Sequence, residues 1–599
     1  MKLAMRSYSV LLLAIRKVTV ENKGKNTAGV DGIIINTPAR RNSLLANRDW
    51  RALVLPARRI YIRKANGKKR PLGIPTVFDR IGQAIMLTAY EPVFETSFEA
   101  RSYGFRPGRG CADAIEAIFS RFGAGNDRWV FDADIRGAFD NISHQFIMER
   151  IAGLPESDRI LEWLKSGYIE GEIFHKTEDG SPQGGIISPL LANIALDGLS
   201  EFLKQFTYLH QHPRVDSRGK PRIGTQTRQK FGYIRYADDF VITSQNREWL
   251  EEVLNDVKQW LAQRGLELNS EKSAIRSIND GFDYLGFNIR QFKGNYLRKD
   301  SNEHKRILAG GKRRSEKRFE KSSSSKTSSI ANPKRKSRTK GKVKKPRALS
   351  EDAFYGKCII TPQKDKVNNF LKEITQLIKN STALTFEQLL RKVNPKLRGW
   401  ANYYRNVCSK QTFLMVHKKV IDTIWRFLKR RHPNKGIKWI TKKYFMKIDG
   451  NKYNPYAEYR MRNGKTSRVI LVNIGKDIPI VRHIQVKGTN SPLDPELTEY
   501  WEKRRKKYGS FLFAKGSKLE WLYNSQEGIC PICGEPLEGE IHVHHIKPIK
   551  DGGTNEWNNQ MMIHKHCHQI KHKELHYPEL SDNANDQGKD KKGRKTKRS

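Results

Sequence analysis

The sequence lacks any run of about 18 consecutive apolar residues, which excludes a membrane-spanning helix of ordinary length. The apolar stretch at residues 10–15 is short and flanked by basic residues, so it suits one face of a helix better than a signal peptide; a transit peptide is left open. Cysteine is also scarce, with six residues among 599. So few cysteines do not form a disulfide framework. Three of them, Cys530, Cys533 and Cys567, share a segment rich in histidine, which indicates a reducing compartment and a metal site.

Acidic residues are few relative to basic ones: 63 Asp and Glu stand against 112 Lys and Arg, and the formal net charge is +49. An excess of this size predicts a polyanionic partner. Because 10% of the residues are aromatic and can stack on bases, nucleic acid is the favoured class of partner. A membrane surface is the competing partner, and the absence of long apolar runs weakens it. The length predicts several domains, about four at the usual domain size.

Two short β-rich runs meet at an Ala-Asp-Asp step within residues 231–243. Aromatic and β-branched residues on both sides favour strands, and the polar dipeptide favours a tight hairpin with Asp238 and Asp239 at its tip. Adjacent carboxylates repel each other, and a bound divalent cation makes such a pair tolerable. The alternative is an ordinary turn, in which Asp is common. The flanking hydrophobic runs favour the cation site.

A basic hairpin and a Gly/Pro loop supply candidate substrate contacts. Residues 58–75 have the pattern of a strand, a turn and a second limb, so Lys64 and Arg70 lie on opposite limbs and can clamp a triphosphate. The alternative is a solvated basic hairpin. In the loop at 180–193, glycines allow close approach of a substrate, and Gln183 can form a hydrogen bond with it.

An alternating strand pattern in residues 129–135 places Asp132 and Asp134 on one face. Together with Tyr236-Ala-Asp-Asp239 and the Gly/Pro loop, this strand resembles the palm of reverse transcriptases of the group II intron type, and the motifs occur in that family's order. The resemblance implies a right-hand polymerase with fingers and palm, followed by an α-helical thumb, or maturase, domain.

The resemblance also implies roles for individual residues. Asp134, Asp238 and Asp239 would bind two Mg²⁺ ions for an in-line displacement. Phe139 matches the bulky gate beneath the sugar, where its ring would clash with a 2′-hydroxyl and favour deoxynucleotides. The other expected substrate-binding residues are Lys64, Arg70, Gln183 and Lys272, the last as a phosphate contact or general acid.

A second chemical centre lies near the C-terminus. Cys-x2-Cys followed by His-x2-Cys offers four soft ligands in two knuckles, the pattern of a closed tetrahedral zinc site. The four expected zinc ligands are Cys530, Cys533, His564 and Cys567. Such a site would hold together a module too small for a large core.

The remaining histidines of this segment form a second set. His568 and His572 are four residues apart and share a helical face, so together with His544 they can bind one catalytic divalent cation. His545 points the other way along an expected strand and can deprotonate water. This layout resembles the ββα-metal nucleases of the HNH type, in which Asn559 takes the orienting position. The alternative is a structural zinc ribbon with spare histidines.

The expected fold is therefore a multidomain α+β protein that ends in a small ββα-metal, zinc-containing HNH domain. The expected divisions are 1–55, N-terminal reverse transcriptase extension; 56–300, fingers and palm; 301–352, disordered basic insertion; 353–445, thumb or maturase domain; 446–515, basic DNA-binding region; 516–578, HNH endonuclease; and 579–599, disordered basic tail.

This organisation predicts a group II intron-encoded protein that acts as RNA-directed DNA polymerase, splicing maturase and site-specific DNA endonuclease in target-primed reverse transcription. The expected partners are intron RNA, target DNA and dNTPs, and no membrane is expected among them. Whether the protein forms a homodimer is left open. The expected setting is the bacterial cytoplasm or an organelle. The alternatives are a splicing factor with decayed enzymatic centres, a stand-alone reverse transcriptase and a defence nuclease.

Overall fold

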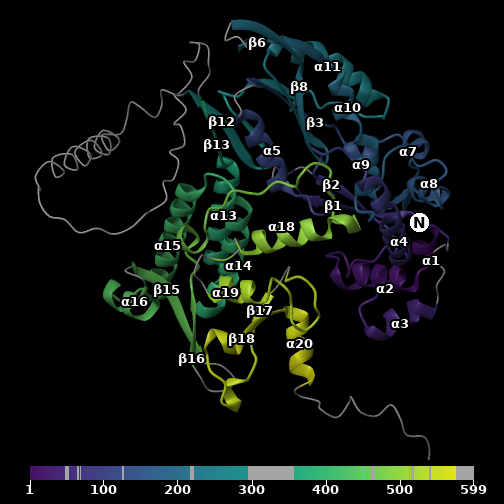
Figure 1. The fold of residues 1–599 in the computed structure, drawn as a ribbon. Helices are drawn as coiled ribbons and strands as arrows, with labels where there is room; N and C mark the ends of the chain where they lie inside the picture. The colour runs from purple at the N-terminus through teal and green to yellow at the C-terminus, as the bar shows by residue number, and fades with distance from the viewer. Residues whose placement is uncertain are drawn as a thin grey trace, which may run out of the picture. The chain divides into compact units, whose positions relative to one another are not determined.

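The computed structural model describes residues 1–46, 53–63, 67, 69–123, 127–215, 221–293, 356–448, 451–460, 466–510, 513, 518–537 and 541–574, whose helices and strands are shown in Figure 1. The chain divides into two compact units. Unit 1 comprises Met1–Thr385, Tyr403–Tyr444 and Arg482–Pro495, and unit 2 comprises Phe386–Asn402, Phe445–Val481 and Glu496–Ser599. Lys64, the insertion expected at 301–352 and the tail expected at 579–599 lie outside the described residues.

Short helices at the N-terminus of unit 1 pack against one long helix, α4 (Val77–Glu95). These short helices are α1 (Lys2–Arg6), α2 (Tyr8–Arg16), the π-helix η1 (Lys17–Glu21) and α3 (Pro38–Ala46), of which α1, α2 and η1 contact α4. Within the apolar stretch at 10–15, Ala14 and Ile15 are buried whereas Leu12 and Leu13 are exposed. The stretch is therefore one face of a helix, as predicted.

The basic hairpin predicted for residues 58–75 is present. Its strands, β1 (Ala57–Arg63) and β2 (Lys69–Ile74), pair antiparallel. A four-stranded sheet of order β2-β1-β4-β5 is completed by β4 (Tyr168–Glu170) and β5 (Ile173–His175). Arg70 is opposite Ile62, so these two side chains lie on the same face of the hairpin.

A second four-stranded sheet, here called the central sheet, has the order β10-β3-β9-β8. Its strands are β3 (Trp129–Asp134), β8 (Phe231–Tyr236), β9 (Asp239–Ser244) and β10 (Ala274–Ser277). Strands β8 and β9 are almost fully buried because α5 (Cys111–Gly123) and α10 (Leu199–Lys204) contact β8, and α11 (Arg247–Ala262) contacts β9. The strand at 129–135 and the hairpin at 231–243 are thus confirmed.

Further elements complete unit 1. They are α6 (Ala138–Asn141), α7 (His144–Arg150), α8 (Ser157–Lys165), α9 (Ser188–Leu196), the β6–β7 ribbon (Thr207–Val215 and Pro221–Gln229), β11 (Phe282–Tyr284), β12 (Phe287–Lys293), β13 (Gly356–Pro362), α13 (Lys364–Asn380), α15 (Lys410–Arg431) and α16 (Ile437–Tyr444). Strand β13 was not predicted; it pairs with β12 and buries Cys358 and Ile360. The apolar residues at 370–378 and 421–427 have helical spacing, and they lie in α13 and α15.

Unit 2 contains most of α14 (Phe386–Tyr404), which it includes up to Asn402. It also contains β14 (Phe445–Ile448), β15 (Asn451–Arg460), β16 (Thr466–Ile470), α17 (Ile474–Asp477), α18 (Thr498–Ser510), α19 (Lys518–Ser525), β17 (Ile541–His545), β18 (Gln560–His564) and α20 (Lys565–Glu574), with short 3-10 turns at Ile549–Asp551 and Trp557–Asn559. A further 3-10 turn, Pro495–Leu497, begins at the last residue of unit 1. The charged run at residues 501–507 lies in α18. Among the described residues, no helix is both long and apolar enough to cross a membrane.

Candidate functional site

The turn between β8 and β9 carries the two adjacent carboxylates. Tyr236 pairs with Asp239 across the hairpin, so Ala237 and Asp238 form the turn itself and Asp239 is the first residue of β9. Ala237 has a φ of 58°, the left-handed backbone conformation that permits so tight a reversal. The hairpin tip predicted for Asp238 and Asp239 is confirmed.

A third carboxylate lies on the neighbouring strand. Asp134 is directly opposite Asp239 in the antiparallel pair β3–β9, and Asp132 lies two residues earlier on the same face. Burial, followed by repulsion from Asp238 and Asp134, raises the pKa of Asp239 to about 7. Burial likewise raises the pKa of Asp238, and it raises the pKa of Asp132 to about 6. The end of the central sheet therefore concentrates negative charge in a poorly solvated place.

Few cations of the protein balance this charge. Lys272 Nζ lies 2.7 Å from Asp134 Oδ2, and the Asn269 side-chain amide donates to the same oxygen over 3.0 Å. Burial and repulsion from neighbouring carboxylates, Asp134 among them, still hold the pKa values of Asp238 and Asp239 above their ordinary range. Hard carboxylate oxygens gathered in this way fit a divalent cation such as Mg²⁺. Lys272 was predicted as a substrate contact, and the structure places it on a carboxylate.

A tight turn at residues 102–107 packs against the β8–β9 hairpin at Ala237. A Cβ atom added to Gly104 would lie 2.2 Å from the backbone nitrogen of Ala237, so only glycine permits this approach. The fully buried Arg235 donates through Nη1 to Asn193 Oδ1 over 3.1 Å, and Asn193 donates to the Gly104 carbonyl over 3.0 Å. The position of Asp238 thus depends on residues about 135 places earlier in the chain.

Two predicted substrate-binding residues, Arg70 and Gln183, come together. Arg70 Nε donates to Gln183 Oε1 over 2.8 Å, and Gln183 Nε2 donates to Asp140 Oδ2 over 3.2 Å. Gly184 has a φ of 128°, and a Cβ atom there would lie 2.4 Å from the Gly73 carbonyl oxygen. The Gly/Pro loop is therefore held tightly against β2, with Arg70 and Gln183 in one hydrogen-bonded group.

The predicted sugar gate lies next to this loop. Phe139 is on α6, one turn after β3, and its carbonyl accepts from the Ser181 backbone N–H over 2.6 Å. Its half-buried ring meets the exposed ring of Phe105 edge to face, with 6.2 Å between centroids. Phe139 thus follows β3, the strand that carries Asp134, and is hydrogen-bonded to the Gly/Pro loop through its backbone.

In unit 2, the four predicted zinc ligands converge. The ligand atoms of Cys530, Cys533, His564 and Cys567 all lie within 4.8 Å of one another. His564 Nε2 is 2.8 Å from the Pro536 carbonyl, and donation to that oxygen leaves Nδ1, 3.4 Å from Cys533 Sγ, as the ligand atom. Backbone hydrogen bonds outweigh burial and lower the pKa of the Cys530 thiol, which favours the thiolate that binds zinc.

The core around this cluster is small. Its buried residues include the zinc-ligand candidates Cys530 and Cys567 themselves, with few apolar neighbours: Leu522, Tyr523, Leu537, Met561, Met562 and Ile563. A core of this size stabilises a module only weakly, and the binding of a tetrahedral metal supplies the additional free energy of folding. The residues therefore fit a structural zinc ion.

The histidines lie on a β-hairpin and the helix that follows it. His544 and His545 are on β17, and His568 and His572 are on α20; the side chain of His572 is outside the described residues. The His544 and His568 rings are neighbours, with 5.1 Å between their centroids. His542, which the sequence interpretation missed, is also adjacent to His568, with 3.4 Å between their Nδ1 atoms. Its spacing of two from His544 was the available signal.

His545 faces a different set of neighbours. Its Nε2 lies 3.0 Å from Asn555 Oδ1 and 3.0 Å from Gln560 Nε2. Asn559 closes the adjoining loop instead: its Oδ1 accepts from the Lys547 N–H, and its Nδ2 donates to the carbonyls of Lys547 and Thr554. The predicted orienting role of Asn559 would therefore act through this loop, whereas Asn555 and Gln560, which were not predicted, contact the imidazole.

Models of four protein families match the chain. They are the N-terminal domain of reverse transcriptase at residues 1–47, reverse transcriptase (RNA-dependent DNA polymerase) at 62–289, the group II intron maturase-specific domain at 367–445 and HNH endonuclease at 530–574. The chain is also 34% identical to protein YkfC of Escherichia coli over 309 residues, which cover 47% of this chain and 80% of YkfC. The group II intron-encoded protein LtrA of Lactococcus lactis is 33% identical over 348 residues.

The chain belongs to the group II intron-encoded protein family. The alignment of this group II intron-encoded protein with LtrA covers 48% of the chain and 56% of LtrA. A protein described as an uncharacterized 91 kDa protein in the cob intron of Schizosaccharomyces pombe is 29% identical over 330 residues, which cover 47% of the chain and 40% of that protein. Reverse transcriptase, maturase and HNH regions therefore follow one another in a single group II intron-encoded chain.

Proposed function

We propose that this protein copies RNA into DNA, assists splicing of its intron RNA and nicks a DNA target, so that the nick primes the copying step. The observation that carries the polymerase function is the meeting of Asp134, Asp238 and Asp239 at one end of the central sheet. In this assignment the β1–β2 hairpin is the fingers, the central sheet is the palm and the helices from α13 to α16 form the thumb.

The three carboxylates would hold two Mg²⁺ ions. When bound, these ions lower the barrier of an in-line displacement by activating the primer 3′-hydroxyl and neutralising the leaving pyrophosphate. The chain's own residues bind and orient the nucleotide: Arg70 contacts the triphosphate, and Gln183 fixes the Arg70 guanidinium through their 2.8 Å hydrogen bond. Phe139 excludes a 2′-hydroxyl by its bulk. Lys272 orients Asp134, and Lys64 remains a predicted phosphate contact.

A basic groove supports RNA binding by the maturase region. Between α13 and α15, two adjoining hollows of about 920 and 530 Å³ share Lys379 and Arg426 in their lining. The exposed cations that line them are Lys372, Lys379, Lys419, Arg426, Lys429 and Arg430, which outnumber the carboxylates of Glu373 and Asp422 in the larger hollow. Such a groove suits an RNA phosphate backbone, which is the contact that the maturase function needs.

The nuclease function is assigned to the ββα module. Zinc would be held by the three cysteines and His564, and it would keep the hairpin and α20 in place. A divalent cation bound by His544, His568 and His572, with His542 beside them, would polarise the scissile phosphate. His545, held by Asn555 and Gln560, would take the proton from the attacking water.

A single coupled assay tests this combination. A duplex target DNA is incubated with the protein, its intron RNA, dNTPs and Mg²⁺, and the products are separated by size. We expect a nicked strand that is extended into cDNA by the wild type, a nick without extension in Asp238→Ala, and neither in His545→Ala. Splicing support without nicking or extension by the wild type would instead indicate a splicing factor with decayed enzymatic centres.

A further inference from the structure

Residues 482–491 form an irregular segment, here called the strap, that belongs to unit 1, although the segments before and after it, Phe445–Val481 and Glu496–Ser599, belong to unit 2. The strap contains no helix or strand, yet His483, Val486 and Ser491 are at most 7% exposed. An irregular segment with buried residues requires specific partners for its backbone and side chains. These partners lie on α5 and on the loop that precedes it.

The first set of partners is on α5. Asp113 Oδ1 accepts from the Val486 backbone N–H over 2.9 Å and lies 2.9 Å from His483 Nε2. Arg482 donates to Glu116 Oε1 through Nε and Nη2, over 2.8 and 2.6 Å. Since the Asp113 and His483 side chains are at most 6% exposed, these bonds are protected from water.

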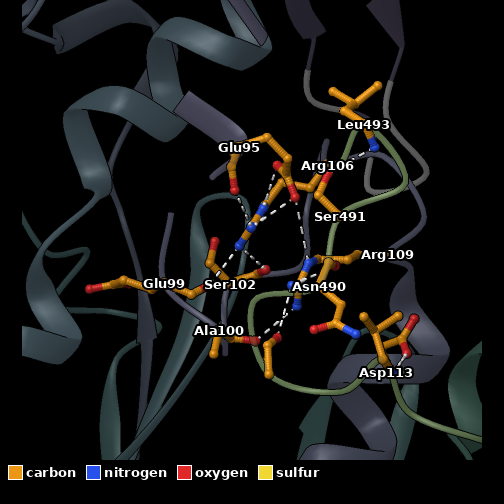
Figure 2. Close-up of polar contacts among 12 residues, drawn as sticks. Glu95, Glu99, Ala100, Ser102, Arg106, Arg109, Asp113, Asn490, Ser491 and Leu493 are labelled. Carbon is orange, nitrogen blue, oxygen red and sulfur yellow. Dashed lines mark hydrogen bonds and ion pairs between the residues drawn. The ribbon is translucent and has the colours of Figure 1, made fainter. Parts of the chain in front are cut away.

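Arg109 joins the strap to the loop before α5. Its Nη2 donates to the carbonyls of Gly488 and Asn490, over 2.9 and 3.2 Å, and its Nη1 donates to the Ala100 carbonyl over 3.0 Å (Figure 2). The neighbouring Arg106 forms a buried ion pair with Glu95 in the same view. One guanidinium thus holds two carbonyls of the strap and one carbonyl of the loop.

The strap also reaches the turn at residues 102–107 that packs against the β8–β9 hairpin. Gln485 Nε2 donates to the hydroxyl of Tyr103, a residue that is fully buried. The Tyr103 backbone N–H donates to the Arg235 carbonyl over 3.0 Å, and the adjacent Gly104 is in contact with Ala237. Gln485 is therefore linked to Ala237, the residue before Asp238, by two contacts, Gln485–Tyr103 and Gly104–Ala237, which the Tyr103–Gly104 peptide bond joins.

We propose that the strap is a positioning element of the polymerase site, with Gln485 acting through Tyr103 on the Ala237-Asp238 turn. This inference rests on the proposed polymerase function. Without Gln485, the buried Tyr103 hydroxyl lacks its donor, and the turn shifts to find another partner. A shift of a fraction of an ångström at Asp238 slows the chemical step, because catalysis requires the reacting groups in one geometry. Nucleotide binding at Arg70 and Gln183 is not affected.

The test measures single-turnover incorporation of one dNTP by the full-length chain. Wild type is compared with Gln485→Ala, Tyr103→Phe and the double variant, and with Thr489→Ala, which alters an exposed strap residue outside these contacts. We expect Gln485→Ala to lower the maximal rate about tenfold while the dNTP concentration for half-maximal rate stays within about twofold. The double variant should be no slower than the slower single variant, because both changes break one contact.

The outcomes separate the inference from the function on which it rests. An active wild type with an unchanged rate in Gln485→Ala would overturn the positioning role and leave the polymerase function intact. A wild type that incorporates no nucleotide would overturn both. DNA nicking and the unfolding temperature are measured on the same samples; if both fall together with the incorporation rate, Gln485 has a general structural role and the inference is wrong.

Discussion

Asp134 and Asp239 lie directly opposite each other on neighbouring antiparallel strands, although 104 residues lie between them in the chain. Like charges in this arrangement destabilise a sheet. The adjacent Asp238 adds to the repulsion, and together with burial this raises the pKa of Asp239 to about 7. The arrangement is unfavourable for the protein alone and becomes favourable when a divalent cation binds, which is the physical basis of the polymerase assignment.

The first prediction concerns stability without divalent ions. The pKa of Asp239 in the fold, about 7, lies above the value near 4 of an unfolded chain, so the folded state retains the proton between these values. The contribution of Asp239 to stability is therefore lost as the pH rises through this interval. In EDTA at pH 8, Asp239→Asn should unfold about 2 °C or more above the wild type, with a smaller difference at pH 5.

Mg²⁺ provides the control for this measurement. At pH 8 it should raise the unfolding temperature of the wild type more than that of Asp239→Asn, because only the wild type has the full set of carboxylates. An Asn variant that is less stable than the wild type in EDTA at pH 8 would contradict the repulsion argument.

The second prediction concerns the choice of sugar. Phe139→Ala removes the ring that would meet a 2′-hydroxyl, so the preference for dNTPs over rNTPs should fall about tenfold or more in primer extension. Phe105→Ala is the matched control, because it removes the ring packed against Phe139 and leaves the gate in place. Equal preference in the wild type and Phe139→Ala would remove Phe139 from the gate role.

The third prediction concerns the zinc site. Cys530→Ser should lose about one equivalent of zinc per chain and abolish DNA nicking, since the module's core is too small to fold without the metal. Primer extension should remain. Cys408→Ser, which changes an exposed cysteine of unit 1, should retain both zinc and nicking. Normal metal content in Cys530→Ser, measured by atomic absorption, would refute the ligand assignment.

The fourth prediction separates two histidines of β17. His545→Ala should slow nicking about a hundredfold or more at any cation concentration, because it removes the general base. His542→Ala should instead raise the cation concentration needed for half-maximal nicking, because His542 adjoins His568. If the two variants responded alike to added cation, the separate roles would be wrong.

Local patterns predicted much of this molecule. The hairpin at Asp238 follows from residues within seven positions of it, and the zinc knuckles follow from spacing alone. Contacts between residues far apart in the chain were harder to predict. The order of the motifs suggested Asp134 as a partner of Asp239. Nothing in residues 482–491 indicated contact with Asp113. Contacts across about 370 residues depend on three-dimensional packing, which a sequence pattern with a short period does not encode.

The side chains around the nuclease histidines illustrate the same limit. Asn559 was recognisable from its place in the motif, whereas the two residues that contact His545 became evident only from the loop conformation. Strand β13 was missed because its partner β12 precedes it by more than 60 residues.

The most direct test of the central claim is primer extension on an RNA template with dNTPs and Mg²⁺, comparing the wild type with Asp238→Ala and with Asp280→Ala, which alters an exposed carboxylate away from the site. We predict cDNA synthesis by the wild type and Asp280→Ala, and its complete loss in Asp238→Ala with RNA binding unchanged. Undiminished synthesis by Asp238→Ala would contradict the assignment of these carboxylates as the polymerase centre.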